Sequence, residues 1–165
     1  MKKEAMERKG WLKDGKAPMA RRCITGNGIT DDTAALQRMI DRVARQAAPR
    51  AEEPGLPNTG PAIHFEASDR VRITGTISID PSIHCADLCF RGANSRSTND
   101  FGSMIFWDGN STDPLFAWGC RGGLLKGLFL SPGSGKTLRC AIDWRADTSG
   151  PGYGPGTAIR IHECN

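Results

Sequence analysis

Residues 26–37 read Gly26-Asn27-Gly28-Ile29-Thr30-Asp31-Asp32-Thr33-Ala34-Ala35-Leu36-Gln37, and this stretch decides how the chain is interpreted. Glycine and asparagine favour a turn, and two adjacent aspartates follow it. An aspartate at the start of a helix accepts hydrogen bonds from first-turn amides and suits the positive end of the helix dipole. We therefore interpret Asp31 and Asp32 as a helix cap and not as a catalytic acid and base.

An amphipathic helix is predicted directly after these aspartates. Apolar residues recur there at the spacing of one helical stripe, at Leu36, Met39, Ile40, Val43, Ala44 and Ala47. Pro49 ends the helix, because proline removes a backbone donor and obstructs the preceding turn. Residues 49–61 contain four prolines and are predicted to form a loop.

Beyond this loop the hydrophobic period changes from helical to two. Val71, Ile73, Ile77 and Ile79 alternate with polar residues, which predicts strands with one apolar face and a bend at Gly75. Similar short runs, separated by turn-rich segments, lie at 62–67, 82–92, 103–108, 114–119, 124–130, 141–145 and 157–162. Short strands of this kind build a sandwich, a barrel or a solenoid, and the period alone does not choose among them.

The stretch at 26–37 resembles the G-D-G-x-T-D-D-T-x-A-[IL]-Q motif that opens β-helices of the pectate lyase superfamily and of phage tailspike-like proteins, with Asn27 in place of the usual aspartate. The likeness extends diffusely over residues 24–165. It implies an all-β solenoid, a right-handed single-stranded parallel β-helix with an N-terminal amphipathic capping helix. In that arrangement the structural cap comprises Asp31, Asp32, Leu36 and Ile40.

The domain organisation follows from this interpretation. Residues 1–22 are rich in charge and lack a steady apolar period, so we expect a flexible arm. Residues 23–165 are expected to hold the cap helix and the first coils of a parallel β-helix. The last predicted strand, at 158–162, has no later segment to cover it. We therefore expect either a solenoid that continues beyond this chain or a homo-oligomer joined through the C-terminal end.

Charge and hydropathy argue against two classes of binding partner, nucleic acids and membranes. The net charge is +4, but eight of the 22 Lys and Arg residues lie in residues 1–22, so the folded part lacks the basic stripe of a nucleic-acid binder. No stretch approaches the roughly 20 apolar residues that span a bilayer. We expect neither nucleic acid nor membrane as a partner. No signal peptide is evident, and the resemblance implies an extracellular or phage-virion location.

Four residues are the candidate substrate-binding set: Trp118, Asp143, Trp144 and Arg145. Indole rings beside charged groups suit the recognition of sugars, although large aromatic side chains also fill the interior of a solenoid. Strand alternation adds a condition to this hypothesis. If Ile142 and Trp144 point inward, Asp143 and Arg145 point outward.

No metal site is predicted from the residues, because Cys85, Cys89 and His84 lack the two tight ligand pairs of structural zinc sites. The six cysteines are interpreted mainly as free, packed thiols. The resemblance implies calcium and an Arg or Lys base in lyases of this kind, on later coils, so the catalytic residues are unknown. We expect a domain that binds a polysaccharide, and the residues leave open whether it also cleaves that polymer by lyase or hydrolase chemistry. The alternative is a non-catalytic structural or host-recognition module.

Overall fold

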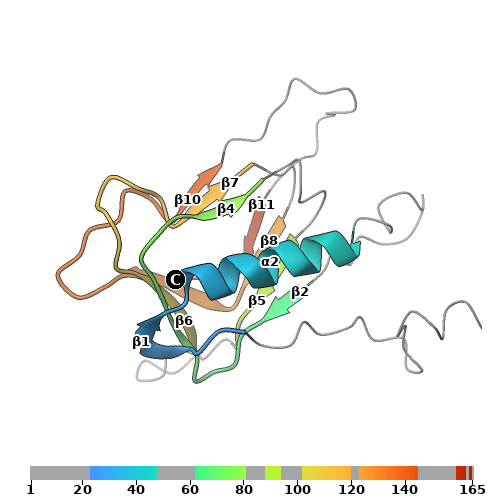
Figure 1. The fold of residues 1–165 in the computed structure, drawn as a ribbon, viewed down its shortest axis with the longest axis horizontal. Helices are drawn as coiled ribbons and strands as arrows, with labels where there is room; N and C mark the ends of the chain where they lie inside the picture. Colours follow the sequence, from blue (N-terminus) through green and yellow to red (C-terminus); the bar gives the residue numbers. More distant parts are fainter. Residues whose placement is uncertain are drawn as a thin grey trace, which may run out of the picture.

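The computed structural model describes residues 23–47, 62–80, 88–93, 102–119, 123–144, 159–162 and 164. These residues form three parallel β-sheets and one helix, α2 (Thr33–Ala47), as Figure 1 shows. The strands are β1 (Asn27–Asp31), β2 (Ala62–His64), β3 (Arg70–Ile73), β4 (Ile77–Ile79), β5 (Leu88–Arg91), β6 (Ser103–Trp107), β7 (Phe116–Trp118), β8 (Gly123–Lys126), β9 (Leu128–Pro132), β10 (Ile142–Trp144) and β11 (Ile159–His162). The regular structure of the described residues is thus mostly parallel β-sheet, as an all-β parallel fold requires.

The strands join the sheets in a repeating order. Sheet A has the order β1-β3-β6-β9, sheet B the order β2-β5-β8-β11, and sheet C the order β4-β7-β10. From β2 onward the chain enters sheet B, then sheet A, then sheet C, and repeats this round with β5–β7 and β8–β10 before β11 returns to sheet B. Each strand therefore pairs with the strand of the same sheet in the next round.

Register places like residues above one another inside the sheets. Interior positions of successive rounds form apolar stacks, which run Ile63-Phe90-Leu125-Ile161 in sheet B, Val71-Ile105-Leu130 and Ile73-Trp107-Pro132 in sheet A, and Ile77-Phe116-Ile142 and Ile79-Trp118-Trp144 in sheet C. In the first two rounds all of these side chains are buried. The stacks are the hydrophobic core, and their burial is the main stabilising contribution.

The largest core residues form an aromatic cluster across sheets B and C. The ring centroid of Phe90 lies 5.5 Å from that of Phe116 and 5.7 Å from that of Trp118, in tilted and edge-on arrangements that favour aromatic attraction. Gly123 lies against this cluster. A β-carbon at Gly123 would overlap the indole ring of Trp118, so the cluster requires a glycine at that position.

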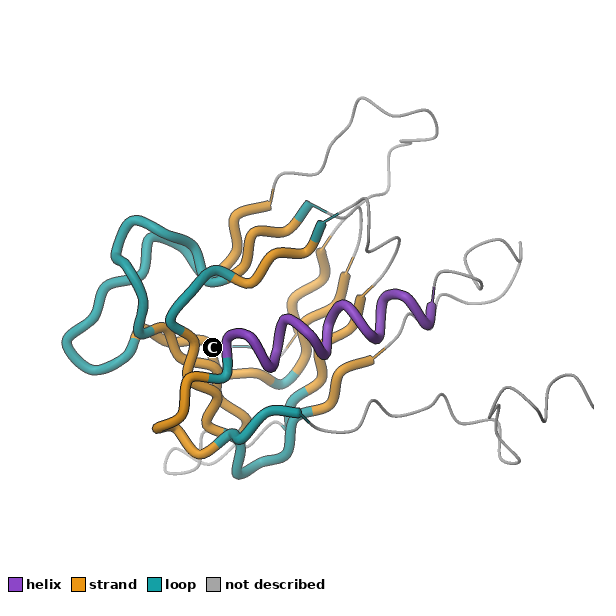
Figure 2. Tube along the Cα trace, viewed as in Figure 1, coloured by secondary structure: helices purple, strands orange, loops and turns teal. Residues whose placement is uncertain are grey.

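Helix α2 lies alongside β4 and β2 (Figures 1 and 2). The apolar side chains on one of its faces belong to the core. Leu36 and Ile40 are fully buried, and Met39 and Val43 are nearly so. These four side chains close the space between sheets B and C beside the first round. The helix begins at Thr33, where the Leu36 amide donates to the Asp32 carbonyl at 2.8 Å.

The two aspartates before α2 have different contacts. One carboxylate oxygen of Asp31 accepts the Thr33 amide at 3.0 Å and the Thr33 hydroxyl at 2.5 Å. Asp32 is buried, and its carboxylate accepts the amides of Thr25 and Gly26 at 2.7 and 2.9 Å. Asp31 therefore binds the first helical amide. The Asp32 carboxylate instead holds the segment that precedes β1, and its hydrogen bonds go to amides of that segment and not to those of the helix.

Side chains of α2 also protect the first strand edges. The Gln37 side-chain amide donates to the Ser78 carbonyl and accepts the Ser78 amide, both at 2.8 Å, as a neighbouring strand would. The Thr33 hydroxyl oxygen accepts the Thr74 amide at 2.8 Å. In sheet A, β1 pairs with β3 and covers that edge. The first-round edges in sheets A and C thus have local partners, which protects them from pairing with another chain.

The predicted sidedness of residues 71–79 is confirmed. Val71, Ile73, Ile77 and Ile79 are buried, and Ser78 is exposed, with a bend at 74–75 between β3 and β4. The prediction had no strand before the helix, and β1 is an addition, because its residues do not alternate. The expected arm at 1–22 lies outside the described residues.

Candidate functional site

A hollow of about 260 Å³ lies on the outer face of sheet C. Its floor comes from three aligned outward positions, because Ser78 pairs with Ala117 and Ala117 pairs with Asp143 in the parallel register. The hollow exists because Ala117 and Gly119 carry almost no side chain there. Its remaining walls are parts of Ile79, Asp80 and Trp118.

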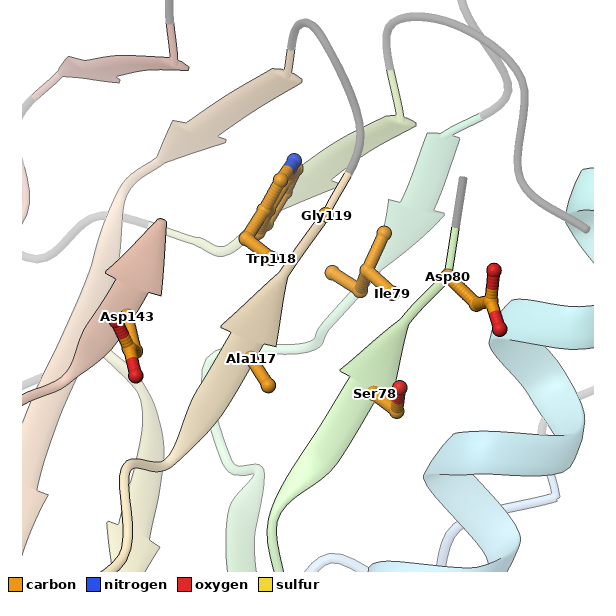
Figure 3. Close-up of a pocket in the computed structure, with 7 residues that line it drawn as sticks. All are labelled: Ser78, Ile79, Asp80, Ala117, Trp118, Gly119 and Asp143. Atoms are coloured by element: carbon orange, nitrogen blue, oxygen red, sulfur yellow. The ribbon is translucent and has the colours of Figure 1, made fainter. Parts of the chain in front are cut away.

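Two carboxylates border this hollow, which we call the sheet C groove. Figure 3 shows Asp143 on one side and Asp80 on the other, with Ala117 and Ser78 between them. Asp143 lies on the last strand of the sheet, and Asp80 directly follows the first. The groove therefore runs across all three strands of sheet C and offers oxygen acceptors at both sides.

A cation lies beside one of these carboxylates. Arg139 donates to Asp143 at 2.9 Å, and the Asp143 side chain is 17% exposed. On the other side, the Gln37 side-chain amide donates to the Asp41 carboxylate at 3.0 Å while it also binds Ser78. The lining of the groove thus includes two carboxylates and the Ser78 hydroxyl, and the Gln37 amide and the Arg139 guanidinium are bonded to lining residues. This mixture suits a ligand with many hydroxyl groups.

The four predicted substrate-binding residues do not form one site. Trp118 is 1% exposed and packs against Phe90 and Phe116, so its ring face is closed to a sugar. Asp143 points outward into the groove, whereas Trp144 occupies an interior register position and is 44% exposed. Arg145 lies outside the described residues. Only Asp143 of the described three presents its side chain to the groove.

Sequence reasoning missed the other groove residues. Ser78, Asp80, Ala117 and Gly119 carry no motif, and their meeting depends on which strands become neighbours in sheet C. The one available signal was the polar or small residue at the centre of each short strand, between two apolar residues: Ser78, Ala117 and Asp143. Alternation assigns such residues to the outer face but does not say that they are adjacent.

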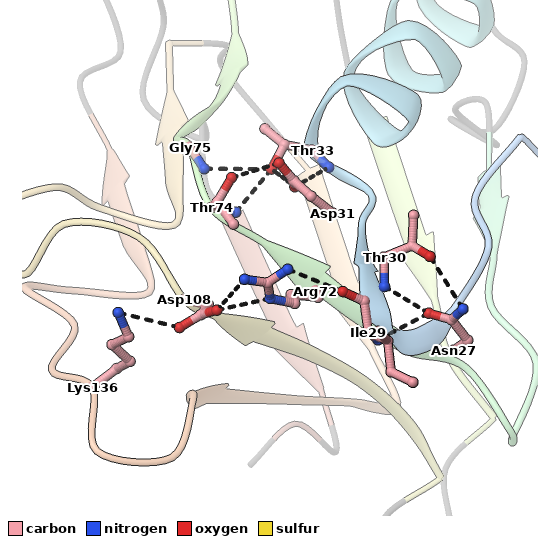
Figure 4. Close-up of polar contacts among 10 residues, drawn as sticks. All are labelled: Asn27, Ile29, Thr30, Asp31, Thr33, Arg72, Thr74, Gly75, Asp108 and Lys136. Carbon is pink, nitrogen blue, oxygen red and sulfur yellow. Dashed lines mark hydrogen bonds and ion pairs between the residues drawn. The ribbon is translucent and has the colours of Figure 1, made fainter.

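A second polar cluster lies on sheet A, where the charged side chains bond to one another (Figure 4). Arg72 donates to Asp108 at 2.7 Å through Nε and to the Ile29 carbonyl at 3.0 Å, and Lys136 lies 3.4 Å from Asp108. The hydrogen bond from Arg72 holds the pKa of Asp108 below its ordinary value against some desolvation, with help from Lys136. These contacts tie three successive strands of sheet A together, so we assign the cluster a structural role.

Asp31 belongs to the same surface. Burial opposes its ionisation, but hydrogen bonds from the Thr33 hydroxyl, the Thr74 hydroxyl and the Thr33 amide, together with the charge of Arg72, outweigh this and lower the pKa of Asp31. The Thr74 hydroxyl donates to Asp31 at 2.6 Å, which joins the start of α2 to the end of β3. A carboxylate used in this way is a structural anchor.

The calcium implied by the family resemblance does not fit the described residues. Calcium takes six to eight oxygen ligands, usually with several carboxylates. Within the described ranges, no three His, Cys, Asp or Glu side chains lie close enough together to hold a metal ion.

Among the described residues, no helix is long and apolar enough to cross a membrane.

No protein-family model, curated protein or solved structure matches the chain. The function is therefore inferred from the geometry and chemistry of the sheet C groove.

Proposed function

We propose that this chain is the capped N-terminal part of a right-handed parallel β-helix, related to the pectate lyase superfamily, that binds a polysaccharide along the outer face of sheet C. Successive strands join sheets B, A and C in a repeating order and always pair in parallel, which supports the solenoid. So does the position of α2, which closes the core beside the first round. Stacked rounds give a long, regular outer face of the kind that extended polymers follow.

The observation that carries the binding proposal is the sheet C groove itself. A glycan chain needs acceptors and donors along a shallow track, and the groove offers Ser78 and Asp80 at the first strand of sheet C and Asp143 on the third. Its floor at Ala117 is low enough for a sugar ring to approach the sheet. A polysaccharide ligand is consistent with an extracellular or virion location.

If the domain also cleaves its ligand, Asp80 and Asp143 are the candidate carboxyl groups for hydrolysis, because both border the groove. They belong to the two outer strands of sheet C, so two strand spacings of roughly 4.8 Å each and a shift along the strands separate them. Arg139 compensates the charge of Asp143, so the Asp80 carboxylate is the group that would repel a uronate. A neutral or amino sugar polymer is therefore the ligand proposed here.

Affinity electrophoresis in gels that contain polysaccharides tests this proposal. Neutral glucans, a chitosan and a polygalacturonate are compared for their retardation of the protein. We expect retardation by a neutral or amino sugar polymer, reduced at least about tenfold in affinity by Asp143→Asn or by Ala117→Tyr, which fills the floor. Asp113→Asn, which removes an exposed carboxylate outside the groove, is the matched control and should change nothing.

Absence of retardation by all polymers would reject binding. Retardation that Asp143→Asn and Ala117→Tyr leave unchanged would place binding elsewhere on the molecule. Release of reducing ends by the wild-type protein but not by Asp143→Asn would identify a hydrolase, and retardation without any release would identify a binding module.

A second candidate function is a non-catalytic structural or host-recognition module, such as a shaft built by continuation of the solenoid or by homo-oligomers. A specific observation favours it. Trp144 and Ile161 occupy interior register positions but are 44% and 57% exposed, so apolar surface is accessible at the last described strands. That end of the molecule is suited to joining another polypeptide.

A further inference from the structure

The first two residues of β1 are an asparagine followed by a glycine, Asn27 and Gly28. Asn27 is exposed, and Gly28 has a φ of 76°, in the left-handed region that glycine adopts at little cost. Because Gly28 has no β-carbon, no side chain of its own shields its amide nitrogen. A side-chain amide next to such a nitrogen can close a five-membered succinimide ring with the main chain.

Two main-chain amides bind the side-chain oxygen of Asn27 (Figure 4). The amides of Ile29 and Thr30 donate to Asn27 Oδ1 at 2.9 and 2.8 Å. Both partners are donors, which identifies the atom they meet as the oxygen of the side-chain amide. Donors on a carbonyl oxygen stabilise the negative charge that develops there when a nucleophile adds to the carbon. The side-chain carbon of Asn27 is therefore activated toward attack.

The side-chain nitrogen of Asn27 also has a partner. Its Nδ2 donates to the hydroxyl oxygen of Thr30 at 3.1 Å. An amide nitrogen leaves as ammonia only after it has gained a proton, and a hydroxyl in contact with it can rotate and pass on a proton from water. Thr30 is exposed, so water reaches this hydroxyl. The turn thus stabilises both the oxygen and the leaving nitrogen of the reacting amide.

The other asparagine in the described part of the chain, Asn110, lacks this arrangement. It is also exposed, but its Oδ1 accepts one amide, that of Thr112, at 3.2 Å. Serine follows it, so the neighbouring amide nitrogen has a side chain beside it. Asn110 is therefore a natural reference for the reactivity of Asn27 within the same molecule.

We propose that Asn27 deamidates itself within the folded protein, by attack of the Gly28 amide nitrogen on the side-chain carbon of Asn27. A bond forms between Gly28 N and Asn27 Cγ, the Cγ–Nδ2 bond breaks, and ammonia leaves. Gly28 N loses its proton to hydroxide from the solvent, and Nδ2 gains a proton through the Thr30 hydroxyl. Water then opens the succinimide to aspartate or isoaspartate, with no oxidation or reduction.

The product changes the edge of sheet A. An aspartate at position 27 gives the same two amides a charged acceptor, and such hydrogen bonds are about twice as strong as neutral ones. An isoaspartate adds one carbon to the main chain of β1, which disturbs its pairing with β3 at Arg70. The ratio of the two products therefore decides whether this edge is strengthened or loosened. The inference does not depend on polysaccharide binding.

Incubation of the purified full chain at mildly alkaline pH, followed by peptide mapping with mass spectrometry, tests this proposal. We expect Asn27 to convert at least about tenfold faster in the folded chain than in the same chain unfolded in guanidinium chloride, a small part of what two oxyanion donors can supply. Asn110 is the internal control and should keep its amide. The rate should rise with pH, because hydroxide removes the Gly28 proton.

Two variants test the part played by the hydroxyl. Thr30→Val should slow conversion at least about tenfold, whereas Thr30→Ser keeps the hydroxyl and should react like the wild type. Circular dichroism establishes that each variant is folded, and the comparison of folded with unfolded wild type decides the matter if Thr30→Val is not. Conversion of Asn27 that is no faster in the folded chain would overturn the proposal. So would equal conversion of Asn27 and Asn110, or a folded Thr30→Val that reacts at the wild-type rate.

Discussion

At the scale of single residues, adjacent carboxylates have unequal structural weight. Asp31 is exposed and binds the start of α2 and Thr74, whereas Asp32 is buried and binds the amides of Thr25 and Gly26. When an exposed capping carboxylate is removed, water can accept the hydrogen bond of the freed amide in its place. Water cannot do this for a buried amide that loses its acceptor. The two positions should therefore differ in how much they stabilise the fold.

Alanine substitution at each position measures this difference. We expect Asp31→Ala to lower the free energy of unfolding by about 1 kcal/mol, the usual loss of a helix cap. Asp32→Ala should cost about 1–3 kcal/mol for the buried Gly26 amide that it leaves without an acceptor, and less for the more exposed Thr25 amide. Urea denaturation followed by tryptophan fluorescence gives both values, and equal losses would contradict the roles assigned here.

The lowered pKa values of Asp31 and Asp108 make a second residue-scale prediction. A carboxyl whose pKa is lower in the folded state stabilises the fold above its unfolded pKa of about 3.9, and this contribution is lost as pH falls through the folded pKa. We expect stability to fall below about pH 4, and Asp108→Asn to be less stable than wild type at neutral pH but closer to it in acid. Denaturation midpoints of the wild type and Asp108→Asn, measured from neutral pH down to below about pH 4, test this prediction. A constant difference between the two proteins at every pH would contradict it.

At the scale of elements, α2 closes the core at the first end. Its stripe of Leu36, Met39, Ile40 and Val43 is buried. We predict that Ile40→Asp unfolds the domain, because it places a charge in an apolar contact without a partner. Ala34→Asp, on the exposed side of the same helix, is the control and should leave the thermal midpoint nearly unchanged. An unaltered midpoint in Ile40→Asp would mean that α2 does not close the core.

The type and the buried face of individual elements could be predicted from the sequence far better than the pairing of the strands. The helix and the alternation at 71–79 follow from local period, because period determines which face of an element is apolar. The partner of each strand does not follow from period. Ser78, Ala117 and Asp143 become one row only because β4, β7 and β10 pair in register, so the groove could not be found before the sheet order was known. Trp118 was ambiguous for the same reason.

At the scale of the whole molecule, the three sheets share one core and differ in what their outer faces carry. Sheet A has the ion pairs of Arg72, Asp108 and Lys136, which link its strands. Sheet C has the groove, with a low floor and carboxylates at its sides. Helix α2 lies beside the first round, and β9, β10 and β11 are the outermost described strands of the three sheets.

Successive rounds stack in parallel, with β7 between β4 and β10. Pairwise cysteine cross-linking in a background without the native cysteines tests this arrangement most directly. Neighbouring aligned residues lie about 5 Å apart across one strand pair, within reach of a disulfide, and residues two strands apart do not. We expect rapid disulfide formation in Ser78→Cys/Ala117→Cys and in Ala117→Cys/Asp143→Cys, and none in Ser78→Cys/Asp143→Cys. Efficient cross-linking of positions 78 and 143, or none at 78 and 117, would contradict it.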